Sequence, residues 1–307
     1  MRCLSFARAM GVRPLLSIKG GEEVVHTALV LGGDVLGDAS PRVLAKMRPD
    51  VVVIDDPIAT TARRWIAAAR KVGAIVVTIH DLGLGCGDAD VVIDGSVTRT
   101  MRVAKDKVGL TGARFAILDP ALPRRAGTRQ SSTTRTVLVA LGGGRRRATA
   151  VAVAEAIAAA DPRATIRIAG GFSANPNTNL EPGTRNPERI SFVGPSRGLG
   201  KELARATVAV VGGGVALYEA CAVGVPAVGV PVVPDQAPTV RAFARRGAAV
   251  GVPFKASEKR AAAEVVALLD DPRRRSLMAR RSKQLVDGHG AQRAAAAVLS
   301  FVERARS

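Results

Sequence analysis

The stretch that decides the fold is VAVVGGGVALYEACAVGVPAVGV, Val208–Val230. Its two apolar runs, Val208–Val211 and Ala227–Val230, each fit a buried parallel strand. The segment between them fits a helix that begins at three glycines. A strand, a glycine turn, a helix and a second strand make one βαβ unit. The stretch therefore predicts an α/β domain built on a parallel sheet.

The glycine turn in this stretch is a candidate phosphate site. Gly213 and Gly214 let a phosphate approach backbone N–H groups without a Cβ in the way, and a helix N-terminus favours negative charge. Glu219, about one and a half turns into the helix, is placed to accept hydrogen bonds from two ribose hydroxyls. The second strand leads to Asp235 and Gln236 on the same rim. A plain βαβ unit also explains the glycines alone, so the combination favours a nucleotide-sugar site.

Strand and helix patterns alternate along the rest of the chain. They predict two Rossmann-like, doubly wound domains that face each other across a cleft, a GT-B-like α/β architecture. We expect an N-terminal domain over 1–122, a Pro-, Gly- and Ser-containing linker over 123–135, and a C-terminal domain over 136–290. A last helix, 291–307, is a candidate to cross back to the first domain.

Apolar runs locate the other strands of the two domains. In the N-terminal domain the predicted strands are 13–18, 51–55, 74–79, 91–94 and 115–118. In the C-terminal domain they are 136–141, 165–169 and 190–193, beside the two strands named above.

The basic charge balance admits two interpretations. Lys and Arg number 45 against 26 Asp and Glu, a net charge of +19. Such a balance can indicate nucleic-acid binding. However, the basic residues are spread along the whole chain, and aromatic residues that could stack on bases make up only 3%. We therefore expect no nucleic-acid partner, and the charge suits an anionic nucleotide substrate.

The sequence shows no targeting or metal signal. No apolar run reaches the roughly 18 residues that a membrane span requires, and Arg8 falls inside the would-be apolar stretch of a signal peptide. The three cysteines are widely spaced, which suits a reducing compartment and offers no metal-ligand spacing. We expect a cytoplasmic protein without stable membrane association, metal or cofactor. The oligomeric state stays open.

Motifs spread over nearly the whole chain match one known family. They are Met1–Ala7, Val51–Asp55, Ile79–Asp81, Leu141–Gly143, Gly212–Gln236 and the Asp-Gly-x-Gly-Ala turn within Leu285–Ala291. The chain resembles the UDP-diacetamido-trideoxy-altropyranose hydrolases of pseudaminic acid biosynthesis. These GT-B-type nucleotide-sugar hydrolases are related to the muramyl-lipid N-acetylglucosaminyltransferase.

The chain departs from that family at its start. In the family, a Gly-x-Gly-His-x-x-Arg motif follows the first strand, and its His is the proposed catalytic group. Arg2 matches the Arg of the motif and is a candidate substrate contact, so the His would fall two residues before Met1. We expect either a start codon assigned too late or a degenerate homologue. A domain without its central first strand would expose backbone edge, which favours the start-codon explanation.

The candidate catalytic residues are His80 and Asp81. The family has Asp at the position of His80, where an imidazole could substitute as general base because its pKa lies near neutrality. A packed residue at the end of a strand is the alternative for His80. Asp81 is expected to contact substrate or water, with a turn or N-cap acid as the alternative.

The resemblance implies a reaction in which water attacks the anomeric carbon and releases UDP and free sugar without a metal. Backbone amides of Gly142, Gly143 and Gly144, together with those of the 213–214 turn, would hold the diphosphate of this UDP-sugar substrate. Gln236 would reach the sugar or the α-phosphate. A glycosyltransferase with a UDP-sugar donor and a non-catalytic nucleotide-sugar-binding homologue stay open as alternatives.

Overall fold

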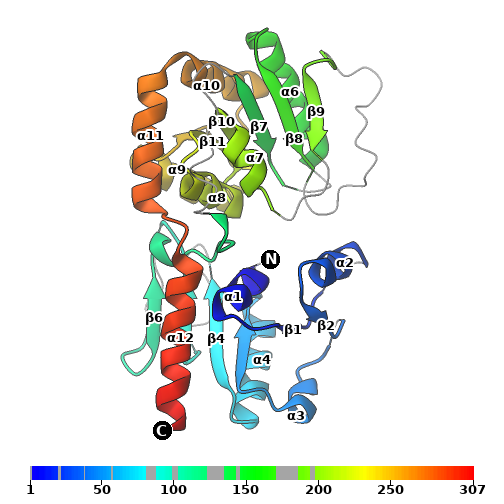
Figure 1. Cartoon of the computed structure of the whole chain (residues 1–307), viewed down its shortest axis with the longest axis vertical. Coiled ribbons are helices and arrows are strands. Elements are labelled where there is room, and N and C mark those ends of the chain that lie inside the picture. The colour runs from blue at the N-terminus through cyan, green and yellow to red at the C-terminus, as the bar shows by residue number, and fades with distance from the viewer. Residues whose placement is uncertain are drawn as a thin grey trace. The chain divides into compact units, whose positions relative to one another are not determined.

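A computed structural model gives the fold of the chain (Figure 1). It describes residues 2–19, 22–37, 39–56, 58–80, 88–98, 103–122, 135–142, 146–170, 186–193 and 198–307. The chain divides into two compact units: unit 1, Met1–Pro120 with Gly288–Ser307, and unit 2, Ala121–Asp287. All strand pairs among these described residues are parallel. The predicted α/β class with two Rossmann-like domains is therefore confirmed.

Unit 2 is built on a sheet of six strands. The strands are β7 Thr136–Ala140, β8 Thr165–Ala169, β9 Ile190–Val193, β10 Val208–Gly212, β11 Ala227–Val230 and β12 Val250–Gly251. The helices are α6 Arg147–Ala160, α7 Gly200–Arg205, α8 Val215–Val223, α9 Ala237–Arg245, α10 Glu258–Asp270 and α11 Pro272–Leu285, with a 3-10 turn η3 at Pro234–Gln236. The spatial order is β12-β11-β10-β7-β8-β9. The chain thus starts in the middle, fills one side, and returns to fill the other.

Helices cover both faces of this sheet. Val137 and Val208 belong to a buried cluster with side chains of α6 and α10. On the opposite face, a Cβ added to Gly229 of β11 would lie 3.1 Å from Val240 of α9 and 3.6 Å from Leu217 of α8. Strands covered on both faces can be apolar at every position, which is why the sequence of β10 and β11 shows unbroken apolar runs.

Local sequence signals set helix ends in unit 2. The first of them is Gly224, which adopts φ 79° at the C-terminus of α8, where a left-handed residue closes a helix and glycine does so without Cβ strain. At the start of α11, the side chain of Asp271 accepts a hydrogen bond from the N–H of Arg274 (2.8 Å), and Pro272 occupies the first helical position. These residues set the observed C-terminus of α8 and the observed N-terminus of α11.

Unit 1 holds a four-stranded sheet and a separate two-stranded one. Its strands are β1 Leu15–Leu16, β2 Asp34–Val35, β3 Val51–Ile54, β4 Ile75–His80, β5 Val91–Asp94 and β6 Val108–Thr111. Its helices are α1 Arg2–Met10, α2 Glu22–Val30, α3 Val43–Met47, α4 Ala59–Lys71 and α12 Gly290–Arg306, with a 3-10 turn η1 at Ala113–Phe115. The larger sheet has the order β3-β4-β5-β6, and β1 pairs only with β2 among the described strands.

Helices also cover both faces of the larger sheet of unit 1. Val77 and Ile93 pack in one cluster with Phe6 of α1 and Ala294 of α12, and α1 and α12 lie against each other (Figure 1). On the other face, Val76 and Val92 pack with the inward side of α4. A third, smaller cluster joins Leu4 of α1 to α2 and the β1–β2 pair.

Two predicted strands of the N-terminal domain were wrong in extent or place. The predicted strand 115–118 is not a strand: Ala113–Phe115 form a 3-10 turn and the strand of that region is β6. Gly109 and Gly112 interrupt the apolar run in this region, so the sequence pattern did not indicate the strand β6. The predicted strand 13–18 shrinks to the two paired residues of β1. Helix α2 and the strands β2 and β12 were not predicted.

Candidate functional site

The strand order of unit 2 creates a switch point between β7 and β10. From β7 the chain turns to one side of the sheet, and from β10 to the other. In open parallel sheets, ligands bind beyond the carboxyl ends of the strands at such a point. Gly142 follows β7 and Gly212–Gly214 end β10, so both glycine turns lie at this edge. Tertiary structure therefore brings together two predicted phosphate loops that are 70 residues apart in sequence.

Gln236 ties the loops of this edge to one another. Its Oε1 accepts a hydrogen bond from the N–H of Gly213 at 3.1 Å and from the N–H of Val232 at 3.0 Å. The first N–H follows β10 and the second follows β11, so one side chain fixes both turns. The amide oxygen of Gln236 is thus engaged within the protein. This leaves the Nε2 group to carry the contact with sugar or phosphate that was predicted for this residue.

The neighbouring glycines of the β10–α8 turn have different reasons to be glycine. A Cβ on Gly213 would lie 2.8 Å from Cβ of Gln236, 2.8 Å from Cγ2 of Val240 and 2.9 Å from a backbone oxygen. Close packing therefore accounts for Gly213. On Gly214 the nearest atom to an added Cβ is Nε2 of Gln236, at 3.6 Å. Of the two, Gly214 is the one that leaves open space over the turn.

The turn after β7 also requires glycine. Gly142 has φ 108°, a conformation that side chains other than glycine rarely adopt, and an added Cβ would meet nothing within 4 Å. Gly142 is exposed and faces open space. Gly143 and Gly144, also predicted to bind the diphosphate, lie outside the described residues.

Helix α8 begins at this edge of the sheet and carries Glu219. Gly214, the N-cap residue of α8, has no side chain to accept hydrogen bonds from the backbone N–H groups of the first turn, which point toward the N-terminal end of the helix. Tyr218 meets Phe243 of α9 edge-to-face, with ring centroids 4.9 Å apart, which fixes the rotation of the helix. Glu219 is half-buried, and Asp235 in η3 is exposed. Their contacts with a nucleotide stay predictions.

The basic run that follows the first glycine turn is partly structural. The guanidinium of Arg147, at the start of α6, lies 4.0 Å from the ring centroid of Phe192 on β9. A cation stacked on an aromatic face in this way is held by the ring. Arg146 is half-buried beside it, and Arg145 lies outside the described residues.

The opposite edge of the unit 2 sheet carries ion pairs. Before β7, Arg135 is paired with Asp161, which is 3% exposed, and with Asp270 at 2.9 Å. Burial alone would raise the pKa of Asp161, but the hydrogen bond from the N–H of Arg163 and the pairing with Arg135 lower it on balance. At this edge Arg135 and Arg163 neutralise the charges of Asp161 and Asp270.

In unit 1, Arg2 is paired within the protein. Its Nε donates to Oδ2 of Asp55 at 3.0 Å, and Nη2 donates to Oδ1 of the same carboxylate. This bidentate pair fastens the first residue of α1 to the end of β3. Burial, and next the charge of Asp55, raise the pKa of the Cys3 thiol to about 12. The predicted contact of Arg2 with substrate would have to share a guanidinium that Asp55 already holds.

The carboxyl edge of the unit 1 sheet places His80 beside a residue that sequence reasoning missed. His80 is the last residue of β4 and Asp94 the last of β5; the two are partners in the strand register. Asp94 is fully buried and His80 is 6% exposed. Asp94 is the acid at the end of the apolar run 91–94, a signal that could have found it. The predicted catalytic residue Asp81 lies outside the described residues.

Metal-ligand clusters and membrane-spanning helices are both absent from the described residues. No group of three or more His, Cys, Asp or Glu side chains is arranged to hold a metal ion within the described part of the chain. Across the same residues, every helix is too short or too polar to span a membrane.

Solved structures share this architecture over nearly their whole length. Spinosyn rhamnosyltransferase SpnG is 17% identical, with 99% of this chain and 96% of that chain covered and a TM-score of 0.68. MurG of Acinetobacter baumannii is 15% identical, with 97% and 95% covered and a TM-score of 0.63. Anabaena HepE, solved in complex with UDP-glucose, is 13% identical, with 98% and 95% covered and a TM-score of 0.60. The chain thus has the GT-B fold.

Comparison by sequence identifies a family. No curated protein matches the chain. A family model described as UDP-glucoronosyl and UDP-glucosyl transferase matches residues 126–283, which is more than half of the 307 residues. The matched segment includes both glycine turns, Glu219 and Gln236. The chain therefore belongs to the UDP-glucoronosyl and UDP-glucosyl transferase family of GT-B nucleotide-sugar enzymes.

Proposed function

We propose that the protein binds a UDP-sugar at the carboxyl edge of the unit 2 sheet and cleaves its anomeric C–O bond with water. The products are UDP and a free diacetamido-trideoxy sugar of the kind used to make nonulosonic, pseudaminic-type acids. The observation that carries the nucleotide site is the meeting of two open glycine turns at the switch point between β7 and β10. The resemblance to the pseudaminic-pathway hydrolases supports water as the acceptor and this sugar class.

In this proposal the nucleotide is held mainly by backbone. N–H groups near Gly142 and at Gly214 donate to the diphosphate, and the N-terminus of α8 adds a partial positive charge. Glu219 accepts hydrogen bonds from the ribose hydroxyls. Nε2 of Gln236 donates to the sugar or the α-phosphate, while its Oε1 keeps the two turns in place. Fixed dipoles of this kind stabilise the charge that develops on a departing diphosphate.

The reaction conserves atoms and electrons without a cofactor. The oxygen of water bonds to the anomeric carbon as the bond from that carbon to the β-phosphate oxygen breaks. The electron pair of the broken bond stays with UDP. One proton of water passes to a general base, for which His80 and Asp81 are the candidates, and then to solvent.

A glycosyltransferase is the second candidate, and the family model favours it. The matched family is described by transferases, and spinosyn rhamnosyltransferase shares the fold. A transferase would use the same donor site and replace water with an acceptor hydroxyl. A homologue that binds the nucleotide sugar without turnover is the third candidate.

Titration calorimetry with UDP tests the nucleotide site. Replacing Glu219 with Ala should weaken binding by about tenfold to a hundredfold, as expected for hydrogen bonds to a charged group. Glu264→Ala is the matched control, because Glu264 lies on α10 in an ion pair with Arg260 at 2.9 Å. Equal affinity of the Glu219→Ala variant and the wild type would remove Glu219 from the site.

Release of UDP then separates the three candidates. The protein is incubated with the UDP-diacetamido sugar alone and with a panel of hydroxyl acceptors. A hydrolase releases UDP at full rate without acceptor, and a transferase only when its acceptor is present. Binding of UDP without turnover in every mixture would indicate the non-catalytic homologue.

A further inference from the structure

Two segments of unit 2 carry basic residues and no acidic ones. Residues 236–256 contain four arginines or lysines and residues 272–286 contain six, and neither segment has an Asp or Glu. The first segment includes α9 and β12, and the second includes α11. The basic residues are therefore not only spread along the chain, because a local excess of positive charge is placed on two helices.

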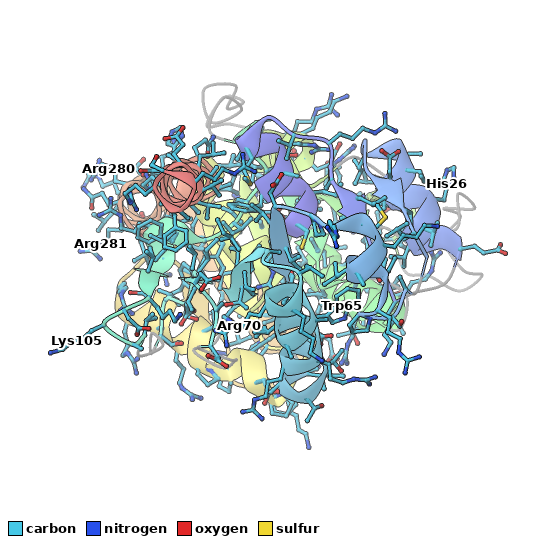
Figure 2. All side chains as sticks on the ribbon, turned by 90° about the horizontal axis from the view of Figure 1, so that it is seen from below. His26, Trp65, Arg70, Lys105, Arg280 and Arg281 are labelled. Carbon is cyan, nitrogen blue, oxygen red and sulfur yellow. The ribbon has the colours of Figure 1, made fainter. Side chains whose placement is uncertain are left out.

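The outward side of α11 is basic and includes one apolar residue. Arg273, Leu277, Arg280 and Arg281 are exposed and stand at positions i, i+4, i+7 and i+8, which lie on one side of a helix. Leu277 is 39% exposed, and Val215 is the other exposed large apolar side chain in the described part of unit 2. Figure 2 shows Arg280 and Arg281 extending outward from the helix.

The C-terminal end of α9 meets this side of α11. Arg245 and Arg246 are exposed at that end, and Gly247 follows them directly. A Cβ added to Gly247 would lie 2.5 Å from Nη1 and 3.1 Å from Cδ of Arg281, so the side chain of Arg281 lies across this glycine. Arginines of both helices therefore gather where the helices meet. We define the basic face as Arg245, Arg246, Leu277, Arg280 and Arg281.

Helix dipoles explain part of this charge. The side chain of Arg281 lies at the C-terminus of α9, and that of Lys283 lies at the C-terminus of α8, where a Cβ added to Gly224 would be 3.2 Å from its Nζ. A helix C-terminus carries a partial negative charge and favours a nearby cation. Arg281 and Lys283 therefore contribute to the fold itself.

The arginines of the basic face have no acidic partner. Arg246 donates a hydrogen bond from Nη1 to the carbonyl of Ala242 at 3.0 Å, which holds the side chain and leaves its charge in place. Within the described part of the chain, no ion pair joins Arg245, Arg280 or Arg281 to an acid. Positive charges gathered in this way repel one another and lower the stability of the fold. An anionic surface bound across them would remove that repulsion.

The basic face lies away from the nucleotide site. Helices α8 and α9 begin at the carboxyl edge of the sheet, after Gly214 and Gln236, and each runs back for nine residues, a length of about 14 Å. Arg245 and Arg281 lie at the far end of α9 from the glycine turns. A diphosphate held at the N-terminus of α8 is therefore out of their reach, and the charge of this face is not explained by the nucleotide.

The residues of the basic face favour a membrane surface over a nucleic acid. Neither α9 nor α11 exposes an aromatic side chain that could stack on a base, since Phe243 is buried. Guanidinium groups bind phosphate through two parallel hydrogen bonds, and lipid head groups supply phosphates at a surface. Leu277 is the deciding residue, because a bilayer offers an apolar phase beneath its phosphates and a nucleic-acid backbone does not.

We propose that the basic face docks the protein on an anionic phospholipid membrane. The arginines contact the phosphates of acidic lipids, and Leu277 enters the boundary between head groups and acyl chains. Attachment through a few surface side chains is weak, reversible and sensitive to salt, and it requires no membrane-spanning helix. This inference goes beyond the proposed function, because it uses residues outside the nucleotide site and does not depend on the reaction.

Co-sedimentation of the full chain with vesicles tests the proposal. One set of vesicles is pure phosphatidylcholine, and the other contains equal parts of phosphatidylcholine and phosphatidylglycerol. The protein should bind only the anionic set at about 0.1 M salt and dissociate at about 1 M salt, where the screening length falls to about 3 Å. Equal binding to both sets, or no binding to the anionic set, would overturn the proposal.

A pair of double variants separates the basic face from the net charge of +19. Arg245→Gln/Arg280→Gln removes two exposed charges of the face and should lower the partition constant on anionic vesicles about twentyfold, since each basic residue near such a surface contributes about fivefold. Arg63→Gln/Arg64→Gln removes two exposed charges from α4 and leaves the same net charge, so it should bind nearly as wild type does. Equal losses in the two variants would overturn the proposal. Circular dichroism checks that both variants are folded.

A substitution at Leu277 separates a membrane from a nucleic acid. Leu277→Ser removes apolar contact and no charge, so it should weaken vesicle binding about threefold to tenfold and leave binding to a labelled oligonucleotide unchanged. Binding to the oligonucleotide in place of anionic vesicles would assign the face to nucleic acid and overturn the proposal. UDP affinity of every variant should match that of wild type, so a failure of the proposed nucleotide site would leave the vesicle result standing.

Discussion

The sheets of the two units differ in continuity. Unit 2 has six strands in one sheet with helices on both faces. In unit 1, the β1–β2 pair is separate from β3–β6, and alternate residues of β3 are half-buried. Of the eleven large apolar side chains exposed among the described residues, unit 2 holds Val215 and Leu277, and unit 1 holds the other nine. A continuous sheet presents one unbroken carboxyl edge, and a divided sheet leaves apolar surface uncovered.

The largest expected effect is a difference in amide exchange between the units. A two-stranded sheet is at best marginally stable by itself. Amides of β1 and β2 should therefore exchange about a thousandfold faster than those of β10, corresponding to roughly 4 kcal/mol of opening free energy. Hydrogen–deuterium exchange with mass spectrometry measures both in one sample. Equal protection of β1 and β10 would show that the units do not differ in stability as their sheets suggest.

The second largest effect is expected from removing a buried charge at the amino edge of the unit 2 sheet. Asp161→Asn is expected to lower the free energy of unfolding by about 3 kcal/mol at pH 7, because Arg135 loses a buried partner. The pKa of Asp161 is lowered in the folded state. Its stabilisation is therefore complete above about pH 4, the unfolded pKa, and is lost as pH falls through the folded value. Urea unfolding of both proteins from pH 7 to pH 2.5 should converge at the acid end, and parallel curves would contradict this.

Adding a methyl group to the packed glycine of the nucleotide edge should have a somewhat smaller effect. Gly213→Ala forces a Cβ against Gln236 and Val240 and should cost about 2 kcal/mol of unfolding free energy. Gly214→Ala meets only the end of the Gln236 amide, so it should change stability little and mainly weaken UDP binding. Chemical unfolding and UDP titration of the two variants provide the test. Similar stability losses in both would mean that the two glycines are not distinct.

The smallest effect is expected for an exposed ion pair of unit 1. Arg13 and Asp34 are joined at 2.6 Å beside the β1–β2 pair, with side chains 68% and 53% exposed. Exposed pairs contribute little because water screens them, so Arg13→Ala should change the free energy of unfolding by less than about 0.5 kcal/mol. A loss as large as that of Asp161→Asn would mean that the β1–β2 pair depends on this bridge.

The sequence predicted most strands of unit 2, and it predicted fewer elements of unit 1. The strands at 165–169 and 190–193 were predicted at their observed bounds, since apolar runs are local signals. β1, β2 and β12 have two paired residues each, too few for a periodic pattern. β6 was displaced in the prediction because glycines interrupt it.

The residues of the candidate sites also divide into those that the sequence indicated and those that only the tertiary structure revealed. Gly142, Gly214 and Glu219 were singled out from glycine turns and a helical carboxylate, and their nucleotide contacts stay predictions. The internal roles of Gly213 and Gln236 could not be foreseen, because they depend on η3 folding back over the turn after β10. Asp94 went unnoticed because its partner His80 is fourteen residues away and meets it only through strand pairing.

The sequence by itself determined the α/β class, because short unbroken apolar runs that alternate with helical periods are typical of parallel strands buried between helices. It also determined which turns lack side chains, since glycine is a local property. Tertiary structure alone decided the order of the strands, and with it the meeting of Gly142 and Gly214 at one edge and of His80 and Asp94 at another. Such meetings follow from which strands lie side by side, and pairing between distant segments leaves no periodic mark in the chain.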